Sequence, residues 1–190
     1  MIQPPTSFKS PREGSSISFS PLKVTMATFH VKSCKKYDDY TTPLSAWEAI
    51  AHLIPRDKVI WEPFYCDGKS GENLRSLGFQ VIHEDEDFFE TDRGDIVVSN
   101  PPFSNVKAVL TRLVELKKPF ILIMPVSKMN TSYFRALFEK ERFQIMIPRK
   151  RIQFNKHENG VTQTEPDGRC SFDCLYYAWQ LNLPNDITWL

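Results

Sequence analysis

Short apolar runs alternate along this chain with amphipathic stretches, a pattern typical of alternating strands and helices. Runs rich in β-branched and aromatic residues predict strands at residues 58–61, 79–82, 95–99, 120–124, 143–147 and 172–179. Apolar positions three and four residues apart predict helices at residues 44–53, 69–77, 105–117 and 131–140. The run at 120–124 is apolar throughout, as expected of a central parallel strand that is covered on both faces.

The order of these elements predicts an α/β fold with a doubly wound, mostly parallel sheet. Residues 1–31 are rich in serine and proline and show no sustained period, so we expect a flexible leader there. Residues 32–190 are then expected to form a single domain.

Polar residues follow three of the predicted strands directly. Glu62 follows the first strand, Glu84 and Asp85 follow the second, and Asn100 follows the third. Ligands of doubly wound sheets bind beyond the carboxyl ends of the strands. We therefore expect a binding site at this edge of the sheet.

Asn100 opens the most informative motif of the chain, which continues with Pro101, Pro102 and Phe103. The prolines stiffen the turn, and the residue before a proline is held extended. An asparagine oxygen and a proline carbonyl can both accept hydrogen bonds, and an aromatic ring stands beside them. This arrangement suits a flat amino group such as the exocyclic NH₂ of a base. The alternative is an ordinary loop, because Asn-Pro and Pro-Pro are common in turns.

Taken in order, the motifs of residues 38–179 resemble those of the class I S-adenosylmethionine-dependent methyltransferases. More narrowly, they resemble the enzymes that methylate the N6 amino group of adenine. The resemblance implies a Rossmann-like sheet with an antiparallel last strand, here residues 172–179. It also implies S-adenosyl-L-methionine as the cofactor, and no metal.

Three segments resemble the cofactor-binding motifs of this family. Residues 40–43 are similar to the element that folds over the methionine end of the cofactor. Residues 61–71 resemble the first-strand motif, in which Glu-Pro is followed by a glycine loop, although the usual G-x-G is stretched here. Residues 84–88 carry the acids that would bind the ribose and the Asp-Phe pair that would lie beside the adenine. The alternatives are a helix-capping turn, a glycine-containing turn and a solvated acidic turn, respectively.

The resemblance assigns roles to individual side chains of these segments. Glu62 or Asp67 would face the methionyl ammonium, and Glu84 or Asp85, with Asp85 favoured, would bind the ribose hydroxyls. The implied cofactor-binding residues are Tyr40, Thr42, Pro43, Glu62, Asp67, Gly68, Gly71, Glu84, Asp85, Asp87 and Phe88. The implied catalytic residues are Asn100, Pro101, Pro102 and Phe103.

A basic cluster of Arg149, Lys150 and Arg151 is a candidate contact for the phosphates of a nucleic acid. Phe154 belongs to a segment, residues 151–154, that resembles a late family motif near the target base. The alternative for the cluster is a solvated face, and the net charge of +1 counts mildly against nucleic-acid binding.

Nucleic acid is therefore the expected partner, with DNA favoured over RNA. Only residues 155–169 and the leader are left for target recognition. This implies low sequence selectivity, a protein partner that supplies recognition, or a target recognised by its structure.

Two other functions share these motifs. Enzymes that methylate glutamine side chains or guanine N2 also carry an Asn-Pro-Pro-aromatic motif, more often with tyrosine than with the phenylalanine found at Phe103. A catalytically silent methyltransferase-like subunit that binds nucleic acid is the third alternative. The stretched glycine loop favours the silent subunit, and the intact motif at Asn100 argues against it.

Composition adds only broad limits. The chain has 190 residues, 41% of them hydrophobic and 25% charged, which is ordinary for a globular protein. It lacks a run of about 18 apolar residues, so we expect no membrane span. The four cysteines contain no C-x-x-C pair, so we expect reduced thiols in a soluble intracellular protein rather than a zinc site. Cytoplasm and nucleus are not distinguished.

Overall fold

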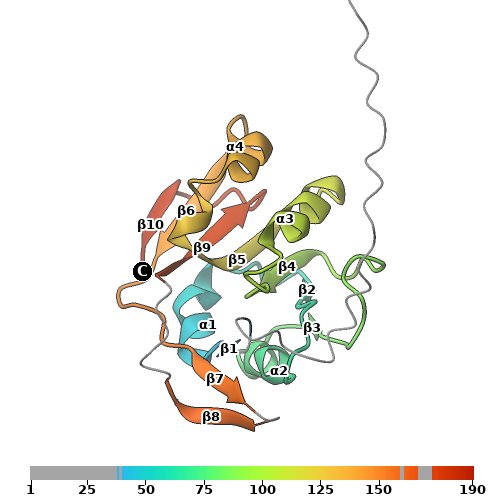
Figure 1. Cartoon of the computed structure of the whole chain (residues 1–190), viewed down its shortest axis with the longest axis vertical. Coiled ribbons are helices and arrows are strands. Elements are labelled where there is room, and N and C mark those ends of the chain that lie inside the picture. The colour runs from blue at the N-terminus through green and yellow to red at the C-terminus, as the bar shows by residue number, and fades with distance from the viewer. Residues whose placement is uncertain (1–37, 39, 159–160, 167–172) are drawn as a thin grey trace, which may run out of the picture.

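The computed structural model describes residues 38, 40–158, 161–166 and 173–190 (Figure 1). Its main feature is a seven-stranded sheet with the strand order β10–β6–β9–β5–β4–β2–β3. The strands are β2 (Ile60–Trp61), β3 (Val81–Ile82), β4 (Ile96–Ser99), β5 (Phe120–Pro125), β6 (Phe143–Ile147), β9 (Cys174–Trp179) and β10 (Ile187–Trp189). Neighbouring strands are parallel, except that β9 is antiparallel to both β5 and β6. The α/β class and the mostly parallel sheet are therefore confirmed.

Helices cover both faces of this sheet. They are α1 (Leu44–Ile50), continued by the 3₁₀ turn η1 (Ala51–Leu53), α2 (Lys69–Ser76), α3 (Val106–Glu115) and α4 (Ser132–Phe138), with a 3₁₀ turn η2 (Val126–Lys128) after β5. The central strand β5 shows how the two layers form. Ile121 packs in the core with Trp47 of α1, whereas its neighbour Leu122 packs in the core with Leu110 of α3. Because both faces of β5 are covered, its sequence is apolar without alternation.

A second, smaller sheet was not expected from the sequence. It consists of β1 (Tyr40–Thr41), β7 (Asn155–Glu158) and β8 (Val161–Pro166), paired antiparallel in the order β1–β7–β8. In Figure 1 it lies beside α2, at the lower end of the molecule. Much of the segment expected to be a loop, residues 155–169, is therefore a hairpin. Its strands are mostly polar, so they lack the apolar alternation by which a half-buried strand is predicted.

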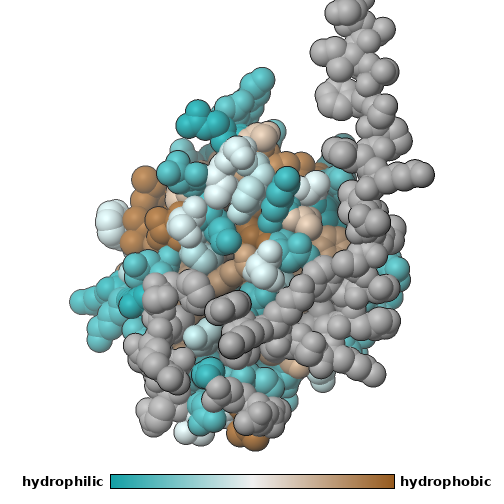
Figure 2. Space-filling view, in the orientation of Figure 1, coloured by the Kyte–Doolittle hydropathy of each residue, from teal (hydrophilic) through white to brown (hydrophobic). Residues whose placement is uncertain are grey.

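The prediction of an antiparallel last strand is correct for β9 but not for the end of the chain. A further strand, β10, follows and pairs parallel with β6 at the edge of the sheet. Two of its three residues are exposed apolar side chains, Ile187 and Trp189. Figure 2 shows a hydrophobic patch at this edge, over β10 in the orientation of Figure 1. A strand this short gives too little pattern to be predicted.

Two further predictions concern the leader and the absence of a membrane span. The leader expected at residues 1–31 lies outside the described residues. Within the described ranges, no helix combines the length and the apolar character needed to cross a membrane.

The parallel strands bring their carboxyl ends to one side of the sheet. This carboxyl edge, which is the edge meant below, is distinct from the lateral edge formed by β10. Trp61 pairs with Ile82 and with Val97, and Ser99 pairs with Leu122. The residues that follow β2, β3 and β4 therefore lie side by side, as the sequence predicts.

Candidate active site

The turn after β4 holds a buried acceptor that lacks a partner among the described residues. Asn100 Oδ1 is shielded from solvent, and no described residue donates a hydrogen bond to it. The turn around it is fixed, because Asn105 N donates to Pro102 O at 3.0 Å and Lys128 Nζ donates to Phe103 O at 3.1 Å. A buried acceptor without a donor costs roughly 1–3 kcal/mol. The turn of residues 100–103, called the corner below, thus keeps an oxygen that a donor from outside the chain would satisfy.

A hydrogen bond joins this corner to the end of β2. Ser99 Oγ donates to Glu62 Oε1 at 2.6 Å, and Phe64 N donates to the same oxygen at 3.2 Å. Glu62 is only 2% exposed. Burial raises the pKa of Glu62 above its ordinary value, and nearby His83 and the hydrogen bond from Ser99 offset only part of this rise. The glycine loop that starts at Glu62 and the corner at Asn100 are therefore direct neighbours.

His83 is a buried residue of this edge that the sequence reasoning missed. Its Nδ1 lies 2.7 Å from Glu62 O, and because a carbonyl only accepts, Nδ1 carries the proton. Its ring is stacked against Tyr65, with centroids 4.9 Å apart. A Cβ added to Gly71 would lie 2.3 Å from His83 Cδ2. Gly71 therefore makes room for His83. The only signal for it in the sequence is its place directly after the strand of residues 79–82.

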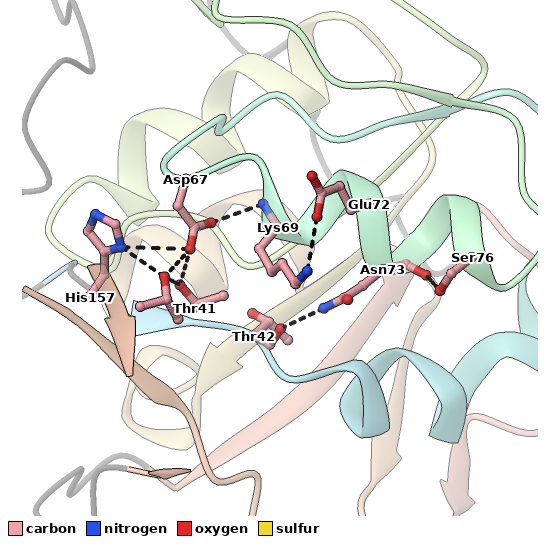
Figure 3. Close-up of polar contacts among 9 residues, drawn as sticks. Thr41, Thr42, Asp67, Lys69, Glu72, Asn73, Ser76 and His157 are labelled. Atoms are coloured by element: carbon pink, nitrogen blue, oxygen red, sulfur yellow. Dashed lines mark hydrogen bonds and ion pairs between the residues drawn. The ribbon is translucent and has the colours of Figure 1, made fainter. Parts of the chain in front are cut away.

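Asp67, in the glycine loop, is held by several hydrogen bonds (Figure 3). Its Oδ1 accepts from Lys69 N at 3.0 Å, and its Oδ2 accepts from Thr41 Oγ1 at 2.8 Å and from Thr162 Oγ1. His157 Nδ1 lies 3.7 Å from Oδ2. Partial burial raises the pKa of Asp67, but the hydrogen bonds from Thr162, Thr41 and Lys69 N outweigh burial, so the pKa lies below its ordinary value. The carboxylate is thus ionised at neutral pH.

Residues 38 and 40–43 contact both the residue after the corner and the glycine loop. Ser104 Oγ, just after the Asn-Pro-Pro-Phe turn, donates to Asp38 Oδ2 at 2.5 Å, while Thr41 reaches Asp67. Thr42 O accepts from Asn73 Nδ2 of α2 at 3.3 Å, and Pro43 is the residue that caps α1. The side chain that contacts the loop is thus Thr41, whereas the sequence reasoning named its neighbour Thr42.

The remaining loop glycine has a conformational role. Gly68 has a φ of 78° and precedes the first residue of α2. This left-handed conformation is strained for residues with a side chain, so glycine is required here by the backbone.

The acids after β3 differ in their surroundings. Glu84 and Asp85 are exposed, so their carboxylates are open to a ligand. Asp87 Oδ1 accepts from Phe89 N at 2.8 Å and fixes the following turn. Phe88 is 4% exposed and packs against Trp61, with ring centroids 5.4 Å apart. The ring of Phe88 therefore belongs to the core, and its role beside the cofactor's adenine stays a prediction.

The basic cluster follows β6 at the same edge of the sheet. Arg149 and Lys150 are exposed, while Arg151 Nε lies 3.0 Å from Asp173 Oδ1 in an ion pair. Phe154 is 1% exposed, and its ring centroid lies 6.4 Å from that of Tyr40. Phe154 is thus a core residue whose ring neighbours that of Tyr40, whereas Arg149 and Lys150 present their charges to solvent.

The part of the chain that the structure describes contains no cluster of three or more His, Cys, Asp or Glu side chains arranged to hold a metal ion. No model of a known protein family matches the chain, and no curated protein matches it significantly.

Proposed function

We propose that this chain is an S-adenosyl-L-methionine-dependent methyltransferase that acts on the N6 amino group of adenine in nucleic acid, with DNA favoured over RNA. The observation that carries the proposal is the buried Asn100 Oδ1, which has no partner among the described residues. An amino group of a base is the kind of donor that would satisfy this oxygen. The resemblance of the motifs to those of the adenine-N6 enzymes, and the antiparallel β9 in an otherwise parallel sheet, add support.

The residues beside the corner fit the cofactor. Asp67 is an ionised carboxylate in a loop that contains the left-handed Gly68, which suits a cationic methionyl ammonium. Glu84 and Asp85 are exposed acids after the neighbouring strand, which suits ribose hydroxyls. When bound, S-adenosylmethionine would supply an electrophilic methyl group on its sulfonium.

The chain's own residues would prepare the amino group for attack. The two N–H groups would donate to Asn100 Oδ1 and to the Pro101 carbonyl, which draws the nitrogen toward tetrahedral geometry. These same acceptors would stabilise the positive charge that grows on the nitrogen as its bond to the methyl carbon forms and the bond from that carbon to sulfur breaks, which would leave a neutral thioether. The surplus proton then becomes acidic and leaves to solvent, so no strong base is required beforehand.

Phe103 would hold the base by stacking, which is worth roughly 1–3 kcal/mol per base. In a duplex the adenine must first be flipped out of the stack, at a cost of a few kcal/mol. Arg149 and Lys150 would contact the phosphates at the same edge of the sheet. Target selection would rest with the hairpin of β7 and β8, with residues outside the described ranges, or with a protein partner.

A labelled-cofactor assay tests the proposal. The protein is incubated with labelled S-adenosylmethionine and separate pools of DNA, RNA and protein, and the digested nucleosides are then analysed by mass spectrometry. The expected product is N6-methyladenine, mainly in DNA. Asn100→Ala is expected to lower transfer at least about a hundredfold. Asn130→Ala, which removes an exposed amide, is the matched control and is expected to have no effect.

Other products would identify other functions. If the methylated group is guanine N2 or a glutamine side chain, that group is the substrate in place of adenine. The roles proposed for Asn100 and Pro101 then still apply. Nucleic-acid binding without cofactor binding would identify a silent subunit. An Asn100→Ala protein with full activity would overturn the assigned role of the corner.

A further inference from the structure

The small sheet touches the glycine loop through one carboxylate. Each of its three strands places one side chain at Asp67: Thr41 of β1 and His157 of β7 (Figure 3), and Thr162 of β8. These side chains also contact one another, since Thr162 Oγ1 lies 2.9 Å from His157 Nδ1 and 3.3 Å from Thr41 Oγ1. The side chains of Asp67 and His157 are only 13% and 18% exposed. These four side chains thus form a partly buried cluster of polar groups that bond to one another, rather than a chance contact on the surface.

The backbone conformation of the loop around Asp67 requires contacts from the rest of the protein. Cys66 and Gly68, on either side of Asp67, both have positive φ, 48° and 78°. For Cys66, which has a side chain, this conformation costs of the order of 1 kcal/mol or more and persists only when the surroundings fix it. Both oxygens of the intervening Asp67 are held, one by Lys69 N and one by the small sheet. The sheet thus helps to set the shape of the turn.

We propose that the small sheet is part of the cofactor site, and that Thr162 and His157 are positioning residues that orient Asp67 toward the methionyl ammonium. This inference rests on the proposed function. It assigns the hairpin of β7 and β8, which comes after the basic cluster in the chain, a task in binding the cofactor. Coupling between two sites is reciprocal, so if the hairpin strengthens cofactor binding, the cofactor must in turn stabilise the hairpin.

This reciprocity gives a test that a purely structural contact would not pass. Cofactor affinity is measured by calorimetry, and amide hydrogen exchange of residues 155–158 and 161–166 is measured with and without S-adenosylmethionine. For the unaltered protein we expect binding, and slower exchange in the hairpin when the cofactor is present.

Three variants at β8 separate positioning from packing. Thr162→Val removes the hydroxyl and is expected to weaken cofactor binding about tenfold, the loss expected for one hydrogen bond to a charged group. Thr162→Ser restores the hydroxyl and is expected to bind within about twofold of the unaltered protein. Thr164→Val is the matched control, because Thr164 is an exposed threonine of the same strand. It is expected to bind the cofactor normally.

The failures of the two proposals are distinguishable. If the unaltered protein binds the cofactor but Thr162→Val binds equally well and the hairpin exchange does not change, the inference is overturned and the proposed function stands. If the unaltered protein binds no cofactor, the proposed function itself is overturned. Should Thr162→Val not fold, His157→Gln takes its place, and the exchange experiment on the unaltered protein still decides.

Discussion

At the scale of single residues, two neighbours at the end of β4 differ in what their buried polar atoms do. Ser99 Oγ donates to the buried Glu62, whereas Asn100 Oδ1 has no donor among the described residues. The first contact stabilises the fold, and the second atom costs stability. Functional sites often carry such a cost, because the group must be kept ready for a ligand.

The contrast between the two residues can be measured. We expect Ser99→Ala to lower the free energy of unfolding by about 1–3 kcal/mol, because it leaves a buried carboxyl group short of a donor. We expect Asn100→Ala to leave the free energy of unfolding unchanged or slightly higher, because it removes an unsatisfied acceptor. Urea denaturation of both variants checks this. A large loss of stability in Asn100→Ala would mean that the oxygen has a partner.

Glu62 gives a prediction about pH. Burial raises its pKa in the folded protein above the ordinary value of 4.5. The folded state therefore binds the proton more tightly than the unfolded state, and stability is lost as the pH rises from 4.5 through the raised pKa. Glu62→Gln keeps an oxygen for Ser99 and has no proton to lose.

The stability of Glu62→Gln relative to the unaltered protein is thus expected to grow as the pH rises. Urea denaturation at several values between about pH 4.5 and pH 7.5 measures this difference. A difference that stays constant over this range would contradict the raised pKa.

At the scale of elements, α2 packs against the end of β3 through the contact of Gly71 with His83. We expect Gly71→Ala to lower the free energy of unfolding by about 1–3 kcal/mol, because the added Cβ overlaps the buried ring. Alanine would otherwise stabilise a helix interior by about 0.5–1 kcal/mol relative to glycine, so the sign of the change is informative. Thermal or urea unfolding measures it.

A double-mutant cycle isolates this contact. His83→Ala vacates the space, so Gly71→Ala in that background is expected to cost less than in the unaltered protein, or even to stabilise it. Equal costs in both backgrounds would show that the histidine is not what excludes a side chain at position 71.

The elements that the sequence predicts well are those with a local pattern. The apolar run of β5 and the helical spacing of α3 each suffice by themselves, because one segment carries the whole signal. The strands of residues 58–61 and 95–99 are predicted in the same way, and they place Glu62 and Asn100 at strand ends. In contrast, β1, β7 and β8 are short and polar, and the pairing of β1 with β7 joins segments more than 100 residues apart. No local pattern predicts such a pairing.

The same limit applies to the site. Asp67 was predicted from its place in the glycine loop, but its partners Thr162 and His157 were not, because they are brought to it only by the folded hairpin. His83 lies directly at a predicted strand end, but nothing in the sequence indicates that its ring fills the space left by a glycine.

At the scale of the whole molecule, we expect nucleic-acid binding to depend more on where the basic side chains lie than on the net charge. Arg149 and Lys150 are exposed after β6, at the edge of the sheet where Asn100 lies. We expect their joint replacement by glutamine to weaken nucleic-acid binding and to flatten its salt dependence. The magnitude of the slope of log K against log salt should fall by about 1.8 for duplex DNA or about 1.4 for a single strand, as expected for two lost phosphate contacts.

Fluorescence anisotropy at several salt concentrations measures this slope. A matched control replaces Lys117 and Lys140 by glutamine. These residues are also exposed and carry the same charge, but they precede β5 and β6 and so lie at the opposite edge of the sheet. If replacing Arg149 and Lys150 leaves the slope unchanged, as expected for the control pair, the basic cluster is only a solvated face.

The placement of β6 has a consequence for how the protein is made. Its neighbours in the sheet are β9 and β10, both contributed by residues 174–190, and β9 alone separates it from β5. A nascent chain that has reached residue 147 can build the half of the sheet formed by β2 to β5, but β6 must wait without hydrogen-bonding neighbours. We therefore expect closure of the sheet to follow emergence of residues 174–190 from the ribosome, since the pairing partners of β6 are not available before then.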